Sequence, residues 1–223
     1  MKAKIAEVFE SIQGEGIYAG TKQIFVRFYG CNLACKFCDT RLTQFDKYSS
    51  LELDNLLQKF PKSVNSICFT GGEPLRQKDF LKEILGIVKH RGYKTYLETN
   101  GTLFNELKEV LDDVDTISMD FKLPSSTGLK SFWDEHKKFL GLASRKDVFV
   151  KTVICHSTKK DDLDRAIGLL RSMDLDIPLV LQPNFFETDN SLLRKISEFQ
   201  EMALNRLKDV RVIPQIHKYI ARR

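Results

Sequence analysis

Hydrophobic residues along the chain form short runs typical of buried strands. Each run is followed by a stretch in which apolar residues recur at helical spacing. The runs predict strands at residues 23–30, 64–70, 93–99, 114–122, 146–154 and 177–183, with a last short strand near the start of 210–219. The stretches between them predict helices near residues 51–59, 79–91, 104–111, 129–142, 161–173 and 191–207. From residue 23 onward, strands and helices therefore alternate.

This alternation implies a parallel sheet, because consecutive parallel strands are joined by right-handed helical crossovers. About six such units favour an α/β fold that is a partial, incomplete TIM-like barrel of parallel strands with outer helices. A doubly wound sheet is the alternative that the spacing leaves open. The chain has 223 residues without repeats or Pro/Gly-rich linkers, so we expect a single domain over residues 1–223.

Unusual residues collect where the predicted strands end. CNLACKFC follows the first strand, and GGEP, ETNG, DFK and QP lie at or just after the ends of later strands. In a parallel α/β barrel, the carboxyl ends of the strands carry the active site. We therefore expect these segments to meet in one site.

Composition narrows the class of protein. The chain is 42% hydrophobic, and its net charge of +5 is spread without a dominant block. Nucleic-acid-binding proteins more often gather such charge on one element, so we expect no nucleic-acid partner. No apolar run reaches the roughly 18 residues of a membrane span, and residues 1–10 lack a secretory signal. Five cysteines, three of them close together, are typical of a cytoplasmic protein with reduced thiols.

Cys31, Cys35 and Cys38 lie within eight positions, a spacing typical of a metal site. A structural zinc site needs a fourth ligand, and no Cys or His follows at suitable spacing. Cys68 and Cys155 lie in apolar runs, where we expect small buried side chains. Three thiolates on a four-iron cluster leave one iron open. We therefore predict a [4Fe-4S] cluster with a vacancy for a substrate or cofactor.

The spacing Cys-x3-Cys-x2-Cys, with Phe37 before the third cysteine, resembles the radical S-adenosylmethionine (SAM) superfamily. TGGEP at residues 70–74 is similar to the motif that holds the amino group of SAM in that superfamily. Its glycines allow a ligand to approach the backbone, and backbone carbonyls with Glu73 can accept hydrogen bonds from an ammonium. A plain turn leading into a helix is the alternative. The resemblance implies that SAM chelates the open iron and is cleaved by one electron to methionine and a 5′-deoxyadenosyl radical.

Other segments resemble one family within that superfamily, the 7-carboxy-7-deazaguanine synthases. These segments are SIQGEG at 11–16, Arg27, CDT at 38–40, ETNGT at 98–102 and PQIHKY at 214–219. The resemblance implies a homodimer with a shortened barrel, reduced by an electron donor such as flavodoxin or ferredoxin. The implied reaction contracts the ring of a small-molecule pterin, 6-carboxy-5,6,7,8-tetrahydropterin. Its products are 7-carboxy-7-deazaguanine, a precursor of queuosine-type deazapurines, and ammonia.

The resemblance also implies roles for single residues. They lie in an N-terminal substrate loop at 9–17, a cluster loop at 31–40 and a C-terminal substrate-facing tail at 210–223, and at later strand ends. The residues implied to contact SAM are Phe37, Cys38, Asp39, Gly72, Glu73, Asp120, Lys122 and Gln182. Those implied to contact the pterin are Ile12, Gln13, Gly14, Arg27, Thr70, Glu98, Gln215 and His217. Thr40 is implied to coordinate Mg²⁺. No side chain is implied to be a nucleophile, because the radical abstracts hydrogen from C6 of the pterin and SAM is regenerated.

The chemistry of the residues leaves alternatives open at several positions. A guanidinium on a strand covered on both faces needs an anion, so Arg27 binds either the substrate carboxylate or an internal Asp or Glu. Glu98 ends an apolar strand and either has a partner or is an acid at a helix entry. In another setting Thr40 would be a turn or cap residue, and His217 a surface histidine.

Two rival functions follow from the same motifs. A glycyl-radical-enzyme activase is also a radical SAM enzyme of similar size, but it has no use for QGEG or Arg27. A structural metal-binding or nucleic-acid-binding module would use the cysteines for four-coordinate zinc and would not cleave SAM. The absent fourth ligand and the placement of the other motifs at strand ends count against such a module.

Overall fold

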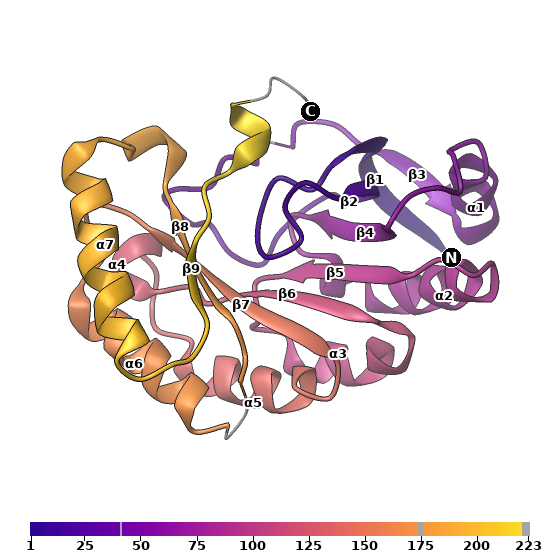
Figure 1. Cartoon of the computed structure of the whole chain (residues 1–223). Helices are drawn as coiled ribbons and strands as arrows, with labels where there is room; N and C mark the ends of the chain where they lie inside the picture. Colours follow the sequence, from indigo (N-terminus) through magenta and orange to yellow (C-terminus); the bar gives the residue numbers. More distant parts are fainter. Residues whose placement is uncertain (41, 174–175, 220–223) are drawn as a thin grey trace.

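The computed structural model describes residues 1–40, 42–173 and 176–219, which build one curved sheet with helices on its outer side (Figure 1). Nine strands lie in the order β3-β1-β2-β4-β5-β6-β7-β8-β9. All neighbours from β2 to β9 are parallel, whereas β1 is antiparallel to both β2 and β3. The partial barrel of mostly parallel strands with outer helices that the sequence predicts is confirmed.

The strands are β1 (Lys2–Ile12), β2 (Lys22–Phe28), β3 (Asp46–Ser49), β4 (Ser66–Gly71), β5 (Thr95–Thr99), β6 (Thr116–Asp120), β7 (Asp147–Ile154), β8 (Leu179–Pro183) and β9 (Val210–Val212). The α-helices are α1 (Ser50–Leu57), α2 (Lys78–His90), α3 (Phe104–Val110), α4 (Pro124–Thr127), α5 (Trp133–Ala143), α6 (Lys160–Arg171) and α7 (Asn190–Leu204). Short 3₁₀ turns lie between these elements or after the last of them, at Pro74–Gln77, Leu111–Asp113, Phe185–Glu187 and Ile216–Lys218. Each predicted strand and helix is present, with ends shifted by a few residues.

Two parts of the fold differ from the prediction. The antiparallel strands β1 and β3 were not predicted, because their many charged residues give a weaker hydrophobic signal than the buried parallel strands. The helix predicted from residue 129 begins only at Trp133. The short helix α4 precedes it and ends at Gly128, whose left-handed φ of 72° stops a helix.

The two faces of the sheet contact different cores. On the outer face, alternate residues of β2 such as Ile24, Val26 and Phe28 are fully buried in the main core beneath the helices. On the inner face, Phe25 packs with Tyr96, Phe149 and other buried residues in a smaller cluster. This inner cluster fills part of the barrel interior with apolar side chains.

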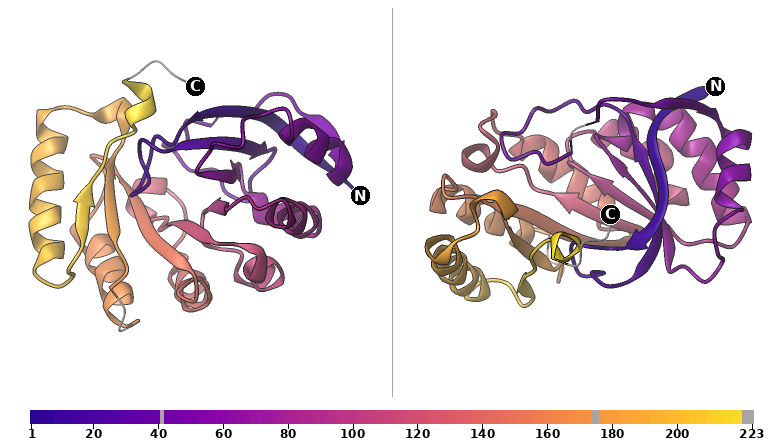
Figure 2. Two further views of the ribbon diagram at one scale, coloured as in Figure 1. Left: turned by 45° about the vertical axis from the view of Figure 1, so that its right-hand side comes forward. Right: turned by 90° about the horizontal axis from the view of Figure 1, so that it is seen from above.

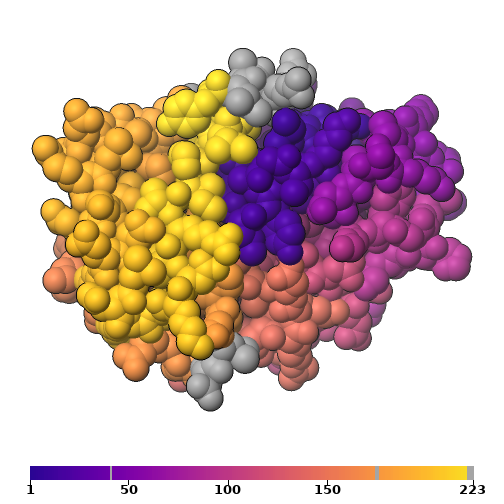
Figure 3. All heavy atoms as spheres, viewed as in Figure 1, coloured from indigo at the N-terminus to yellow at the C-terminus, as the bar shows by residue number. Residues whose placement is uncertain are grey.

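The barrel does not close by strand pairing, because β3 and β9 are the two edges of the sheet. Figure 2 shows the strands as an open arc with the helices outside it. The C-terminal segment nevertheless meets the loop that follows β1, since Ile216 N donates to Gly14 O at 2.9 Å. Figure 3 shows the C-terminal segment in yellow against the N-terminal segment in indigo. No helix in the described part of the chain is long and apolar enough to cross a membrane.

Candidate active site

A cavity of about 960 Å³ lies at the carboxyl ends of the strands, where the sequence motifs were expected to meet. It brings together nearly all predicted site residues. They are Ile12, Gln13, Gly14, Arg27, Cys31, Cys35, Phe37, Cys38, Asp39, Thr40, Thr70, Gly72, Glu98, Asp120, Lys122, Gln182, Gln215 and His217. Of the predicted set, Glu73 alone does not line this cavity.

The cysteine loop leaves the end of β2 and is held by contacts to its backbone. Lys36 N donates to Thr127 O at 2.9 Å, and Arg76 Nη1 donates to Cys31 O at 3.0 Å. Burial raises the pKa of the Cys31 and Cys35 thiols, so without a bound cation they are protonated at neutral pH. Cys68 is buried in β4 and Cys155 is buried directly after the end of β7, so both are small buried side chains as predicted. The three loop thiols therefore have no cysteine as a fourth partner.

Among the residues that the structure describes, no three His, Cys, Asp or Glu side chains converge as the ligands of a single metal ion do. A structural zinc ion needs four protein ligands, whereas three thiolates can hold a four-iron cluster with one iron open. The chemistry of the three loop thiols therefore fits the predicted cluster.

Gly71 and Gly72 bring the end of β4 directly under the cysteine loop. Gly71 has a φ of 127°, and a Cβ there would lie 2.2 Å from Phe28 O. A Cβ on Gly72 would lie 2.1 Å from Gly30 O. Only glycine fits these two positions, so backbone rather than side chains faces the ligand space at this strand end.

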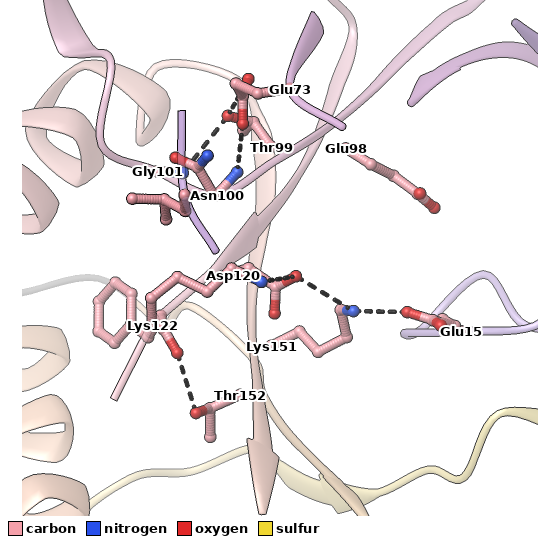
Figure 4. Close-up of polar contacts among 12 residues, drawn as sticks. Glu15, Glu73, Glu98, Thr99, Asn100, Gly101, Asp120, Lys122, Lys151 and Thr152 are labelled. Atoms are coloured by element: carbon pink, nitrogen blue, oxygen red, sulfur yellow. Dashed lines mark hydrogen bonds and ion pairs between the residues drawn. The ribbon is translucent and has the colours of Figure 1, made fainter. Parts of the chain in front are cut away.

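Glu73 is the one predicted SAM contact that lies outside the cavity lining. Its side chain is fully buried and accepts hydrogen bonds from Thr99 Oγ1 and Asn100 N at 2.9 and 2.8 Å (Figure 4). It also accepts from Leu75 N at 3.2 Å. Burial raises the pKa of Glu73 to about 7. The carboxylate thus ties β4 to the end of β5 and does not reach the cavity. The backbone carbonyls of this segment remain as the acceptors for an ammonium.

A row of buried charges crosses the cavity from the loop after β1 to the end of β6. Glu15 pairs with Lys151 at 2.5 Å, Lys151 with Asp120 at 3.3 Å, and Asp120 with Lys122 at 3.0 Å (Figure 4). Burial alone would raise the pKa of both carboxyl groups. Lys151 and the hydrogen bond from Gln215 hold the pKa of Glu15 below its ordinary value, and Lys122 with Lys151 does the same for Asp120. Burial likewise opposes the charge of Lys151, yet Asp120 and Glu15 raise its pKa. All four groups are therefore charged at neutral pH.

Sequence reasoning missed two members of this row, Glu15 and Lys151. Lys151 interrupts the apolar run VFVKTVI of β7, and a lysine there needs a buried partner. That signal was present in the sequence. Nothing in the sequence identified Glu15 as the partner, because the two residues are 136 positions apart.

Glu98 is also held in place by neighbours. Gln13 Nε2 donates to Glu98 Oε1 at 2.9 Å, and Thr70 Oγ1 donates to Glu98 Oε2 at 2.6 Å. Burial raises the pKa of Glu98, and the nearby Glu15 raises it further. Helix α3 begins only at Phe104, so Glu98 is oriented by these two donors and not by a helix entry.

Arg27 points into the cavity from β2. Its nearest acid is Glu7 on the adjacent strand β1, whose Oε2 lies 3.2 Å from Arg27 Nε. The contact is an ion pair without a hydrogen bond, and this buried Nε has no hydrogen-bond partner among the described residues. The Glu7 side chain is 55% exposed, at the rim of the cavity. The internal acid expected as an alternative partner is therefore present, but it leaves the guanidinium free to bind a second anion.

The C-terminal segment lies between the cysteine loop and the loop after β1. Asp39 Oδ2 accepts from Gln215 Nε2 at 3.2 Å and pairs with Lys218 Nζ at 3.0 Å. Gln215 Nε2 also donates to Glu15, and a Cβ on Gly14 would lie 1.9 Å from His217 Nδ1. His217 is a cavity residue and not a surface histidine, and burial lowers its pKa. Residues 220–223 of the predicted tail lie outside the described residues.

The predicted magnesium ligand lies at the end of the cysteine loop. Thr40 Oγ1 lines the cavity and donates to Asp39 Oδ1 over a long 3.4 Å. The side-chain oxygens of Thr40 and Asp39 therefore lie next to each other. Mg²⁺ prefers oxygen ligands of this type.

Two oxygen atoms of the cavity have no hydrogen-bond partner in the described part of the chain. They are Asp120 Oδ1 and Gln182 Oε1, both buried. A buried acceptor without a partner is costly unless a ligand supplies the donor. The residues predicted to contact SAM thus present free acceptors, as a ligand rich in hydroxyl and amino groups requires.

His136 lies behind this site and makes the stability of the fold depend on pH. Its ring is fully buried and stacks on Phe121 at 5.0 Å, and burial lowers its pKa to about 4. The folded protein therefore keeps His136 neutral, whereas the unfolded chain binds a proton below pH of about 6.5. We expect wild type to lose about 2 kcal/mol of unfolding free energy relative to His136→Gln between pH 8 and pH 5.

Urea unfolding of both proteins at the two pH values measures this difference. If wild type and His136→Gln lose the same free energy on acidification, another group causes the loss.

Comparisons of the sequence and of the fold with known proteins agree on one family. The family profile described as the Radical SAM superfamily matches residues 25–162, more than half of the chain. A 7-carboxy-7-deazaguanine synthase of Geobacter sulfurreducens is 35% identical, over 98% of this chain and 97% of that protein. Its counterpart in Thermoplasma acidophilum is 37% identical, over 97% and 96%. The fold is similar to the crystal structure of QueE from Escherichia coli, with a TM-score of 0.67 and 21% identity over 96% of this chain and 94% of that chain.

Proposed function

Since the chain belongs to the radical SAM superfamily and, within it, to the 7-carboxy-7-deazaguanine synthases, we propose that it catalyses the ring contraction of 6-carboxy-5,6,7,8-tetrahydropterin to 7-carboxy-7-deazaguanine with release of ammonia. As a radical SAM enzyme it uses a [4Fe-4S] cluster and SAM. The observation that carries the proposal is the single cavity in which Arg27, Glu98 and the QGEG loop face the cysteine loop. An activase of glycyl-radical enzymes, whose substrate is a polypeptide backbone, has no need of these groups.

The chain's own residues hold the cofactors in this proposal. Cys31, Cys35 and Cys38 would bind three irons of the cluster, and the fourth would remain open to SAM. The backbone at Gly72 would accept from the amino group of SAM, and the free oxygens of Asp120 and Gln182 would accept from its hydroxyl and amino groups. When bound, cluster and SAM supply the radical that abstracts hydrogen from the substrate. Lys122 keeps Asp120 ionised and therefore a strong acceptor.

Other residues would hold the pterin. The guanidinium of Arg27, which pairs with the half-exposed Glu7, would also bind the substrate carboxylate, for which two parallel N–H donors are well suited. Gln13 and Thr70 orient Glu98, whose remaining lone pairs would accept from N–H groups of the pterin. Gln215 and His217 would cover the substrate from the C-terminal segment. The contribution of these residues to catalysis is positioning.

The proposal includes a magnesium ion, an electron donor and a dimer. Thr40 would give Mg²⁺ one protein ligand, and the other positions would be filled by water and substrate oxygens, as is common for this ion. Flavodoxin or ferredoxin would reduce the cluster, and two copies of the chain would form a homodimer. These parts, and a cytoplasmic location, rest on the family resemblance and on the reduced cysteines.

Anaerobic turnover with reconstituted, reduced protein tests the proposal. With SAM, MgCl₂ and 6-carboxytetrahydropterin, we expect mass spectrometry to detect 7-carboxy-7-deazaguanine without stoichiometric loss of SAM, at a lower rate when MgCl₂ is omitted. Cleavage of SAM without a deazapurine would contradict the proposed substrate and favour a protein substrate. Absence of both SAM cleavage and product would contradict the reaction class.

A further inference from the structure

We propose that Lys151 couples the binding of SAM to the binding of the pterin. The proposal rests on the proposed function, because that function assigns Asp120 to SAM and the loop of Glu15 to the pterin. Lys151 lies in the middle of β7, and its buried side chain reaches the cavity between these two carboxylates. Neither Lys151 nor Glu15 belongs to the residues that the family resemblance implies.

On the SAM side, Lys151 contacts Asp120, whose two carboxylate oxygens differ in their partners. Asp120 Oδ2 pairs with Lys122 at 3.0 Å and with Lys151 at 3.3 Å. Asp120 Oδ1 is buried without a hydrogen-bond partner among the described residues. A SAM hydroxyl that donates to Oδ1 would fix the plane of this carboxylate and leave both lysines in contact with Oδ2. Binding of SAM would thus restrict where the Lys151 ammonium lies.

On the pterin side, Lys151 contacts a residue in the middle of the substrate loop. Glu15 pairs with Lys151, and its other oxygen accepts from Gln215 Nε2. Glu15 N donates to Gln13 Oε1 at 3.0 Å, and Gln13 in turn donates to Glu98. Through Glu15, the position of Lys151 therefore affects the positions of three residues that would surround the pterin: Gln13, Glu98 and Gln215.

The row of contacts predicts that SAM and the pterin strengthen each other's binding. A SAM molecule that orders Asp120 and Lys151 also orders Glu15 and its loop before the pterin arrives. The pterin then loses less conformational entropy on binding, so SAM raises its affinity. By thermodynamic linkage, the pterin raises the affinity for SAM by the same factor.

Lys122 provides a matched control. Both lysines contact Asp120 Oδ2, and the side chains of Lys122 and Lys151 are 12% and 10% exposed, but among the described residues only Lys151 pairs with Glu15. Lys122→Met and Lys151→Met therefore remove the same type of contact from the SAM side. Only Lys151→Met breaks the connection to the substrate loop.

The test is the dissociation constant of 6-carboxytetrahydropterin, measured anaerobically by calorimetry with and without saturating SAM. The cluster of the reconstituted enzyme is kept oxidised, so that SAM is not cleaved and no turnover occurs. In wild type we expect SAM to tighten pterin binding by about five-fold or more, the lower range of measured couplings. Lys122→Met should weaken the binding of SAM itself, because Lys122 is among the residues implied to contact SAM, so SAM is raised until this variant is saturated. At saturation we expect Lys122→Met to keep the wild-type coupling factor. In Lys151→Met we expect that factor to fall close to one.

Glu15→Gln supports the test from the other end of the contact. It keeps the size of the side chain but weakens its pairing with Lys151, so the coupling factor should fall there too, even if Lys151→Met does not fold. If wild type binds the pterin and the coupling factor stays unchanged in the folded Lys151 and Glu15 variants, the coupling role is wrong and the proposed function stands. If wild type does not bind the pterin, the proposed function fails and the coupling with it.

Discussion

Serine in place of Cys35 should leave the protein without its cluster and without activity. Cys35 is the middle one of the three proposed cluster ligands and lies half-buried at the cavity. A serine hydroxyl is a poor ligand for iron, and the structure offers no other cysteine at this loop. Loss of residues that only orient metal ligands typically costs 10–100-fold, so loss of a ligand itself should reduce activity by more than about 100-fold.

Iron content and visible absorbance of the anaerobically reconstituted protein measure this effect. Cys155→Ser is the matched control, because Cys155 is equally a free thiol but lies buried at the end of β7, where it accepts from Asn184 Nδ2 at 3.6 Å. We expect about four irons per chain in wild type and in Cys155→Ser. Full iron content in Cys35→Ser would show that the ligand set is wrong, and equal loss in both variants would point to misfolding.

Methionine in place of Arg27 should weaken recognition of the substrate carboxylate. The guanidinium has a buried Nε without a hydrogen-bond partner among the described residues, and its one acidic neighbour, Glu7, is poorly aligned and half-exposed. Truncation of one partner of a buried charged pair costs about 2–5 kcal/mol, which corresponds to roughly a 30-fold to several-thousand-fold loss in kcat/KM. Arg27→Lys keeps the charge but not the forked donor geometry, so its loss should be intermediate.

Tetrahydropterin that lacks the 6-carboxylate distinguishes a contact with that carboxylate from a general effect on the shape of the site. If Arg27 contacts that carboxylate, wild type and Arg27→Met should bind this analogue with equal affinity, and the two proteins should differ only on the full substrate. If Arg27→Met weakens the binding of both compounds to the same extent, Arg27 supports the shape of the site without contacting the carboxylate.

The sequence was most informative where burial and spacing are strict. Parallel strands covered on both faces produce continuous apolar runs, and each such strand was found. Strands β1 and β3 lie on the antiparallel side of the sheet, and residues such as Lys4 and Glu7 dilute their hydrophobic signal. Local patterns therefore predicted the barrel but not the two antiparallel strands, β1 and β3, that extend its sheet.

The site was predictable to the level of segments. Motifs at strand ends identified what lines the cavity, because the topology of a parallel barrel brings those ends together. The orientation of a single side chain was not predictable, and Glu73 is the example. Its motif lies at the cavity, but its carboxylate turns into the protein toward Thr99 and Asn100. Pairing between distant residues was likewise not predictable from the sequence. Glu15 and Lys151, for example, are 136 positions apart.

The hydrogen bond between Gln215 and Glu15 also bears on when the enzyme becomes competent during its synthesis. The two residues are 200 positions apart, and contacts of such long range form late in folding. A nascent chain that has passed β4 already carries the three cysteines and the turn beneath them, but not Lys151, Gln215 or His217. The pocket proposed for the pterin is therefore complete only after the C-terminal segment has packed against the loop after β1.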